Sequence, residues 1–270
     1  MEQVTLNGAA IEYEVRGSGE PLLFIHGAIL ADAFFPLLNE PTIANHYRVI
    51  YYHRRGFGSS DRAPNPFMIH QQAADCRALL HHLDIARTHV AGHSYGAITA
   101  LQLALDSPDA MQSLALLEPI VLDAIPSGPM FGEGLEPVIG MYERGDKVGA
   151  LDAFLTAVVG TDYRQVIDKV LPPGAFDLAV ADLDTFFQVE WPALQEWRFT
   201  ADDAQRIVQP VLSVVGGETA PFFSETHELL EQWLPQTEEL VIPQVTHGLQ
   251  MMNPSAVADG LARFFTKHTR

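Results

Sequence analysis

Short apolar runs alternate with longer helical patterns through the first 120 residues of the chain. Four runs are dominated by apolar residues: 22–25, 47–52, 88–91 and 114–117. Runs of this kind are typical of strands that are buried on both faces of a sheet. Helical patterns at 68–83 and 95–105 lie between them. Strands separated by helices predict parallel pairing, and therefore an α/β protein with a doubly wound, mostly parallel sheet.

The pattern changes after Pro119. Residues 121–205 contain no buried strand run, and their helical stretches are interrupted by Pro and Gly and rich in aromatic residues. Two strand patterns and a final helical pattern follow: 210–215, 239–242 and 256–265. The sequence therefore predicts a core domain made of residues 1–120 and 206–270, with a helical lid insertion at 121–205 over the sheet.

Composition and charge narrow the expected partners. The chain has 270 residues, a hydrophobic fraction of 47% and a formal net charge of −18. This acidic balance repels phosphate backbones and anionic lipid, so we expect neither nucleic acid nor a membrane surface as a partner. A single cysteine, Cys76, excludes an intrachain disulfide. The sequence shows no signal-peptide pattern and no apolar stretch of about 20 residues, which predicts a soluble, cytoplasmic protein.

Candidate chemistry begins with the segment Gly92-His-Ser-Tyr-Gly96, which matches the pattern G-x-S-x-G. It follows a short apolar strand pattern and precedes a helical pattern that starts with small residues. A nucleophilic serine requires this strand–turn–helix setting, because the two glycines let strand and helix approach around a strained turn. The helix N-terminus beside the serine favours negative charge. We therefore predict that Ser94 is a nucleophile.

A second loop is expected to supply the oxyanion hole. A tetrahedral intermediate needs two N–H donors that point at its oxyanion. One donor is expected from Tyr95, the residue after the nucleophile. The other is expected from Ala28, which follows His26 and Gly27 after an apolar strand run. We expect the side chain of His26 itself to be structural.

The general base is predicted to be His247, which lies between the last strand pattern and the last helix. A loop at that place lies at the same sheet edge as Ser94, as a base for this serine must. The other histidines fit less well. For example, His89 falls near the end of a helix, and His227 lies in a helical pattern beside acidic residues.

Together these features resemble the α/β-hydrolase family over nearly the whole chain. The segments that carry the resemblance are 26–27, 54–59, 92–96, the helical insertion after 117–119, and 246–248. The resemblance implies an eight-stranded sheet, a lid over the pocket, and hydrolysis without a cofactor or a metal. The expected partner is a small-molecule substrate, and the sequence leaves a homodimer open.

One position departs from the family pattern. In most such enzymes an Asp follows the seventh strand, but here Ala220 stands at that place and cannot orient a histidine. A minority of the family, including certain lactone hydrolases and dehalogenases, carries the acid at the end of the preceding strand. Glu118 ends that strand in this chain, so it is the favoured acid. Two alternatives stay open, namely Glu218 and no acid at all.

The sequence thus predicts a serine hydrolase that cleaves a neutral or weakly polar ester or lactone through an acyl-enzyme, with Ser94, His247 and Glu118 as catalytic residues. One alternative is a carbon–carbon hydrolase acting on a diketone with the same residues. Another is a ligand receptor on a hydrolase scaffold with vestigial turnover. An epoxide hydrolase or dehalogenase is disfavoured, because those enzymes use an Asp nucleophile. Aromatic residues of the insertion are the predicted pocket walls: Phe186, Phe187, Trp191 and Trp197.

Overall fold

An eight-stranded sheet organises the chain in the computed structural model, which describes residues 1–62 and 67–269. In spatial order its strands are β1 (Glu2–Leu6), β2 (Ala9–Arg16), β4 (Tyr47–Tyr52), β3 (Glu20–Ile25), β5 (Thr88–His93), β6 (Met111–Leu117), β7 (Val211–Gly216) and β8 (Thr237–Ile242). Strand β2 pairs antiparallel with β1 and β4, and the other pairings are parallel. The predicted α/β class and mostly parallel sheet are confirmed.

The apolar runs form strands because each lies between two hydrophobic cores. Successive side chains of a strand point to opposite faces of the sheet. In β3, Leu23 and Ile25 belong to one core, whereas Leu22 and Phe24 belong to the other, and all four are fully buried. A strand in this position has no solvated face, so its sequence cannot alternate between apolar and polar residues.

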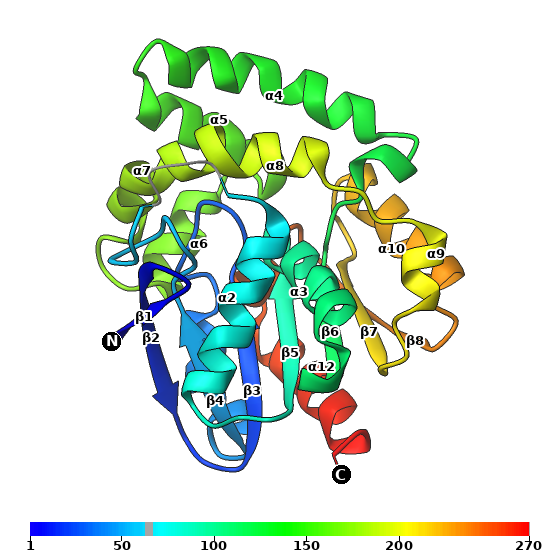
Figure 1. Ribbon diagram of the computed structural model, residues 1–270. Helices are drawn as coiled ribbons and strands as arrows, with labels where there is room; N and C mark the ends of the chain where they lie inside the picture. The colour runs from blue at the N-terminus through cyan, green and yellow to red at the C-terminus, as the bar shows by residue number, and fades with distance from the viewer. Residues whose placement is uncertain (63–66, 270) are drawn as a thin grey trace.

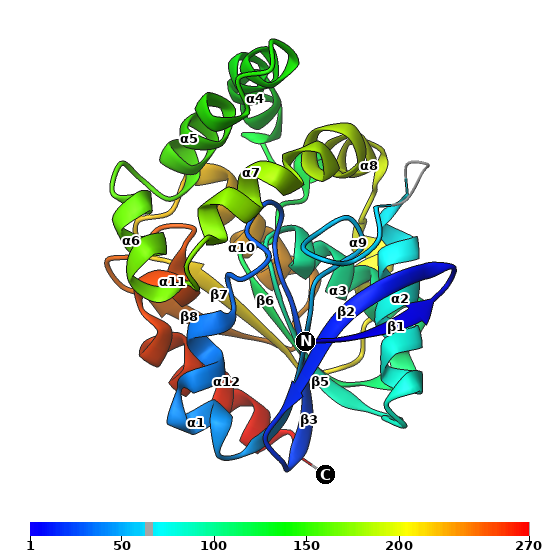
Figure 2. The same cartoon turned by 90° about the vertical axis from the view of Figure 1, so that its left-hand side faces the viewer.

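Helices on the two faces of the sheet complete these cores (Figures 1 and 2). One face packs against α2 (Ile69–His82), α3 (Tyr95–Asp106) and α10 (Pro221–Trp233). The other packs against α1 (Pro41–Ala44) and α12 (Pro254–Lys267). Short helical segments connect some of these elements: η1 (Phe35–Asn39), η2 (Pro108–Ala110) and α11 (Leu249–Met252). Helices on both faces make the sheet doubly wound, as predicted.

The segment between β6 and β7 is helical and lies across one end of the strands (Figure 1). Its elements are η3 (Leu122–Ala124), α4 (Gly128–Glu143), α5 (Lys147–Val158), α6 (Tyr163–Val170), α7 (Ala175–Thr185), the π-helix η4 (Phe186–Glu190), α8 (Trp191–Glu196) and α9 (Ala201–Gln205). Parallel strands β5, β6 and β7 end beneath these helices. The loops that follow those strands therefore lie between the sheet and the insertion.

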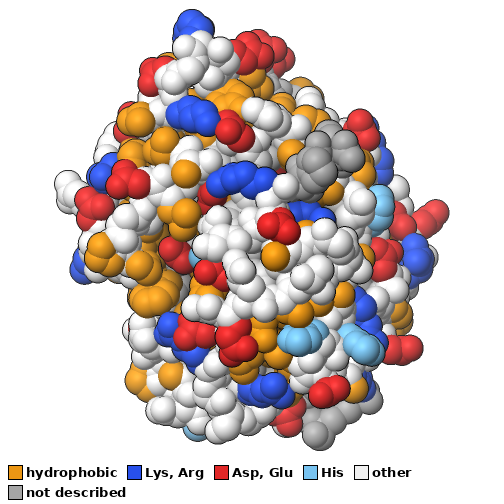
Figure 3. Space-filling view, turned by 60° about the vertical axis from the view of Figure 1, so that its left-hand side comes forward, with side chains coloured by type: hydrophobic (Ala, Val, Ile, Leu, Met, Phe, Trp, Pro, Cys, Tyr) orange, Lys and Arg blue, Asp and Glu red, His pale blue; other side chains and the backbone are white. Residues whose placement is uncertain are grey.

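The surface carries charged side chains of both signs, and the single cysteine lies in the core. Acidic and basic side chains are interspersed on the face in Figure 3. Across the described part of the chain, no helix is long and apolar enough to cross a membrane. Cys76 is fully buried, and burial raises the pKa of its thiol to about 12. It is therefore an unreactive core residue.

Candidate active site

Ser94 lies in a strained turn between β5 and α3. Its backbone has φ 54° and ψ −121°, which a residue with a side chain rarely adopts. The turn is held from both sides, because Ser94 N donates to Leu117 O at 2.8 Å and Ala97 N donates to Ser94 O at 2.9 Å. Strain of this kind persists only where neighbouring structure fixes it, and it occurs preferentially at active sites.

The two glycines of the G-x-S-x-G segment are required by close backbone contacts. A Cβ at Gly92 would overlap the carbonyl oxygen of Gly96, and a Cβ at Gly96 would overlap that of Ile25. Both neighbours are backbone atoms, which cannot move aside as a flexible side chain can. The glycines therefore let α3 start directly against β3 and β5, with Ser94 at the junction.

The loop after β3 contains a second strained backbone. Leu30 N donates to Ala28 O at 2.7 Å, which closes a γ-turn around Ile29. Ile29 has φ 69°, so this is the rare and strained form of the turn, and its residue is β-branched. Ala28 and Tyr95 line the same cavity as Ser94. Tyr95 is the first residue of α3, so its N–H has no acceptor within the helix.

His247 and Glu118 meet at the edge of this cavity. His247 Nδ1 donates to Glu118 Oε2 at 2.6 Å, which leaves Nε2 as the basic nitrogen. Glu118 is 1% exposed, and its Oε1 accepts from Gly216 N at 2.7 Å. Ser94 and His247 line the cavity together. The structure thus brings the three predicted catalytic side chains to one place from β6 and from the loops after β5 and β8.

Burial sets the protonation of this pair. It lowers the pKa of His247 to about 3 and raises the pKa of Glu118 to about 7. Both directions have the same cause, because a poorly solvated site disfavours an isolated charge on either group. The directions favour a neutral imidazole at neutral pH, which is the protonation state that a general base needs.

Two neighbours that sequence reasoning missed hold the ring and the backbone of His247 in place. Phe223 of α10 stacks on it, with ring centroids 3.8 Å apart and an interplanar angle of 6°. His93 Nε2 donates to His247 O at 2.9 Å. His93 stands inside the G-x-S-x-G segment, so its position next to the nucleophile was a usable signal. The sequence around Phe223 contained no such signal, because only the fold brings α10 next to the loop after β8 that holds His247.

The alternatives for the acid lie elsewhere. Glu218 is exposed, in the turn after β7, and its backbone N–H donates to Val245 O at 3.0 Å. Ala220 is the residue that precedes α10. Glu118 reaches His247 from the end of β6 with a φ of 46°, a third strained residue next to the cavity. The contact of His247 with a carboxylate is therefore made by Glu118.

The cavity beside Ser94 is small and apolar. A second cavity shares Ser94, His247 and Phe154 in its lining, and each of the two holds about 30 Å³. That volume accommodates about one water molecule. The first is lined by Ala28, Ser94, Tyr95, Ile98, Ile120, Phe131, Phe154, Val158, Phe186, Leu194, Phe223 and His247. The insertion thus closes over the candidate site.

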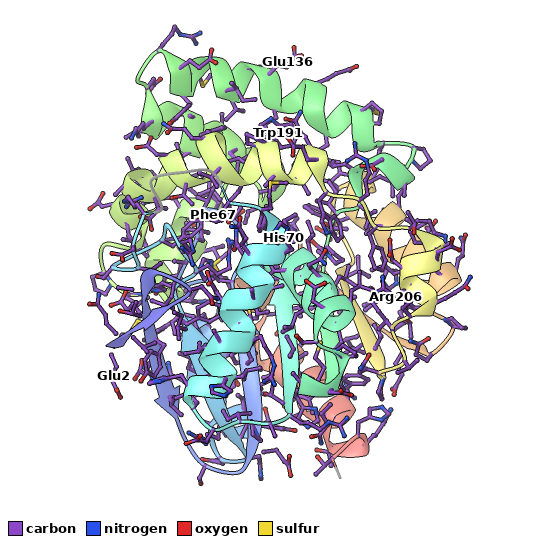
Figure 4. The ribbon with its side chains drawn as sticks, in the orientation of Figure 1. Glu2, Phe67, His70, Glu136, Trp191 and Arg206 are labelled. Carbon is purple, nitrogen blue, oxygen red and sulfur yellow. The ribbon has the colours of Figure 1, made fainter. Side chains whose placement is uncertain are left out.

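Only one of the four predicted pocket walls lines these cavities, namely Phe186. Phe187 stacks on Tyr142 of α4, with ring centroids 4.5 Å apart. Trp191 lies at the start of α8 beneath α4 (Figure 4), and its ring centroid is 6.0 Å from that of Phe131. Trp197 Nε1 donates to Gln102 of α3 at 2.8 Å. These three side chains pack the insertion together or onto the core. The helical period of 3.6 residues predicts which side chains are buried, but it cannot distinguish side chains that pack between helices from side chains that line a pocket.

Within the described residues, one group has the spacing of metal ligands. His227, Glu231 and Glu239 hold their ligand atoms within 4.8 Å of one another. They lie on α10 and β8, outside the lining of both cavities. His227 Nε2 is 3.3 Å from Glu239 Oε1, so a hydrogen bond between the two side chains already accounts for their approach.

Comparison with known proteins bears on the fold. A family model for the alpha/beta hydrolase fold matches residues 20–254. A fluoroacetate dehalogenase from Burkholderia sp is 36% identical over 135 residues, which are 48% of this chain and 42% of that protein. A soluble epoxide hydrolase from Corynebacterium sp. (strain C12) is 32% identical over 63% of this chain and 57% of its own length. This chain therefore spans about half the length of these relatives.

One solved structure is similar over almost the whole chain. It is Est816, described as an N-acyl homoserine lactone degrading enzyme. Its sequence is 26% identical, the match covers 97% of this chain and 100% of that chain, and the TM-score is 0.75. The overall fold of this chain thus has a counterpart in a known structure.

Proposed function

This chain belongs to the alpha/beta hydrolase fold family, and on that premise we propose that it is a serine hydrolase that cleaves a neutral or weakly polar ester or lactone. The observation that carries the proposal is the 2.6 Å contact between His247 Nδ1 and Glu118 Oε2 at a cavity that Ser94 also lines. Serine, imidazole and carboxylate are the components of acyl transfer through a covalent intermediate. The fold and the relatives' names support hydrolysis in general.

The proposed reaction has two halves. In the first, Ser94 Oγ attacks the substrate carbonyl carbon while His247 Nε2 takes the hydroxyl proton. The N–H groups of Ala28 and Tyr95 stabilise the oxyanion, and the leaving alcohol receives the proton from His247. In the second, water attacks the acyl-enzyme with the same assistance and releases the acid. Glu118 keeps the proton of the free imidazole on Nδ1 and stabilises the imidazolium that forms.

The lining of the cavities supports an uncharged substrate. It includes two histidines but no Lys, Arg, Asp or Glu among the described residues. An apolar site of this kind penalises a buried charge, so a free carboxylate would bind poorly. Similarity to a lactone-degrading structure at 26% identity supports a lactone as one candidate. Ser94, rather than an Asp, disfavours dehalogenation and epoxide opening.

Covalent labelling with a fluorophosphonate tests the nucleophile. An activated serine attacks such phosphorus reagents rapidly, so the wild-type protein should be labelled at Ser94, and Ser94→Ala should not be labelled. His247→Gln should label slowly, because it lacks the base. If the wild-type protein does not react, or if Ser94→Ala reacts equally, Ser94 is not the nucleophile.

A substrate panel tests the reaction class. Short-chain esters, lactones and diketones should be offered to the same preparation, and we expect multiple turnovers on esters or lactones. Turnover of diketones alone would identify a carbon–carbon hydrolase instead. Binding without turnover over the whole panel, in a protein that Ser94 labelling shows to be folded, would favour a receptor.

A further inference from the structure

Arg54 is an unusual side chain for the interior of this fold. It follows β4 by two residues and is 1% exposed. Its Nε donates to His26 O at 2.9 Å, and its Nη2 donates to Gly27 O at 2.8 Å. These are the two carbonyls immediately before Ala28. One planar guanidinium group therefore fixes the direction of the loop that carries the first expected oxyanion donor.

The same group contacts the second expected donor segment. The Arg54 guanidinium carbon lies 5.0 Å from the ring centroid of Tyr95, the first residue of α3. A buried cation over an aromatic face is attracted to it, because the face carries partial negative charge. Arg54 is thus in contact with both of the segments whose residues Ala28 and Tyr95 line the cavity at Ser94.

The other edge of the guanidinium contacts the insertion. Arg54 Nη1 donates to Gln72 of α2 at 2.5 Å and also forms an ion pair with Glu190. Glu190 is fully buried and ends the π-helix η4. The first residue of η4 is Phe186, which lines the cavity. π-helical segments occur frequently at functional sites.

A substrate-binding role for Arg54 does not fit these contacts. Its charge is already balanced by Glu190, and it lines neither of the two cavities at Ser94. The strained γ-turn at Ile29, in contrast, must be held by its surroundings, because an isolated chain would relax it. The donors of Arg54 bind directly before that turn.

We propose that Arg54 is a positioning residue of the oxyanion hole, and that its ion pair with Glu190 makes the geometry of the hole depend on the docked insertion. The inference rests on the proposed hydrolase function. In this arrangement, opening of the insertion removes the counter-charge of Arg54 and loosens the Ala28 loop. Closure over a substrate restores both. The insertion therefore acts on the chemical step as well as on access.

Arg54→Lys tests the proposal, because it keeps the positive charge but removes the planar pair of N–H donors that bind His26 O and Gly27 O. A lysine ammonium can pair with Glu190, yet it cannot hold both carbonyls in the plane that the guanidinium defines. We expect kcat for the best ester of the panel to fall at least tenfold, with KM within threefold. Loss of a single oxyanion donor lowers kcat by about 10²–10³-fold, and this range is the upper limit for the fall that we expect in Arg54→Lys.

Arg55→Lys is the matched control. Arg55 is the adjacent residue and forms a comparable pair, in which Nε and Nη2 donate to Asp75 at 2.9 Å each. It contacts neither the Ala28 loop nor Tyr95 through any recorded hydrogen bond of the described residues. If Arg54 only stabilises the fold, both variants should lower the melting temperature and leave kcat nearly unchanged.

A transition-state analogue separates positioning from a general structural defect. Ser94 Oγ adds to the carbonyl carbon of a trifluoromethyl ketone, His247 takes the proton, and the former carbonyl oxygen becomes an oxyanion. Affinity for this adduct should fall in Arg54→Lys by the same factor as kcat/KM, whereas affinity for the uncharged alcohol product should not. Equal losses for both ligands would overturn the proposal.

The double variant Arg54→Met/Glu190→Met keeps the test decisive if the lysine variant does not fold. Replacing a buried ion pair by apolar residues is often neutral or stabilising, because no charge stays uncompensated. We expect a folded protein with at least tenfold lower kcat and slower fluorophosphonate labelling. A folded double variant with kcat within threefold of wild type would refute the role of Arg54. Absence of turnover by the wild-type protein on both the esters and the lactones of the panel would instead refute the proposed hydrolase function.

Discussion

At the scale of single residues, the candidate site depends on where backbone strain is stored. Ser94, Ile29 and Glu118 all have positive φ. Ser94 and Glu118 carry groups that the proposed chemistry uses, and Ile29 follows Ala28, an expected oxyanion donor. A left-handed conformation costs about 1–3 kcal/mol at such a residue. The strain turns each chain segment sharply at the end of a strand, so that a hydroxyl, an amide and a carboxylate can point to one small volume.

The first prediction concerns the carboxylate. Glu118→Gln should keep the hydrogen bond to Gly216 N but lose the negative charge beside His247 Nδ1. The imidazole can then adopt the wrong tautomer, and we expect kcat to fall by about 10²–10⁴-fold with little change in KM. Steady-state kinetics on the best panel substrate measures this effect.

Its control is Glu218→Gln, at the exposed position of the turn after β7. This variant should have nearly wild-type kcat. If Glu118→Gln lowered the melting temperature but left turnover within about threefold of wild type, Glu118 would only satisfy backbone donors. Ala220→Asp in the Glu118→Gln background should recover part of the lost rate if that position retains the usual geometry.

At the scale of elements, the insertion is a set of helices whose pocket-facing side chains come from distant turns. Phe154 of α5 and Phe186 of η4 have ring centroids 5.2 Å apart and both line the cavity. Phe154 also lines the second cavity. The size of the site is therefore decided by the packing of two helices.

The second prediction follows from that packing. Phe186→Ala should enlarge the cavity and raise the rate for a hexanoate ester relative to an acetate ester by about tenfold, which corresponds to about 1.4 kcal/mol. Phe187→Ala is the matched control, because Phe187 stacks on Tyr142 outside the lining. It should lower the melting temperature without changing this ratio. Equal ratios in both variants would show that Phe186 does not limit the acyl chain.

A third prediction concerns the junction of β2, β4 and the loop after β3. His53 lies between Glu12 and Asp32, at 2.9 and 3.0 Å. Burial disfavours its charge, but the hydrogen bonds that its two N–H groups donate to the carboxylates outweigh burial and raise the pKa of His53 to about 9. An unfolded histidine has a pKa of about 6.5. The stabilisation is thus fully present below pH 6.5 and is lost as pH rises through about 9.

The free energy of unfolding should therefore fall between pH 6.5 and 9, by up to about 3 kcal/mol from this group. Urea denaturation at a series of pH values measures the slope. His53→Gln should flatten it, whereas His46→Gln, at an exposed position, should leave it unchanged. A wild-type free energy that is constant over this range would mean that His53 is not charged in the folded protein.

At the scale of the whole molecule, charge opposes the folded state. The formal net charge is −18 on 270 residues. Self-repulsion of this kind destabilises a compact chain, and salt screens it. On the visible face in Figure 3 both signs are interspersed, so local pairs offset part of the repulsion. The balance of these two effects decides how stability responds to ionic strength.

The fourth prediction is that the melting temperature rises by a few degrees between about 10 and 200 mM NaCl, because the Debye length falls from about 30 Å to below 10 Å. Differential scanning fluorimetry measures it, with KCl at the same ionic strength as the control for specific ion effects. A falling melting temperature would show that surface ion pairs outweigh the net repulsion.

The sequence by itself determined the succession of strands and helices along the chain and the positions of the candidate catalytic residues. Apolar runs without alternation require a sheet that is covered on both faces, and the covering helices follow from the patterns between them. The glycines at 92 and 96 indicated a strained serine, because only glycine permits the backbone contacts found there. These features are local or periodic, so they can be detected without coordinates.

Only the tertiary structure decided which distant residues meet. The contact of Glu118 with His247 joins β6 to the loop after β8, and no spacing in the sequence distinguishes it from a contact made by Glu218. The pocket wall also needed the packing of the helices, since Phe154 and Phe186 face the cavity while Phe187 and Trp191 do not. Arg54 reads in sequence as one more charged loop residue, yet it lies at the junction of sheet, α2 and η4. Periodicity reports that a side chain is buried, whereas a catalytic or positioning role depends on what it is buried against.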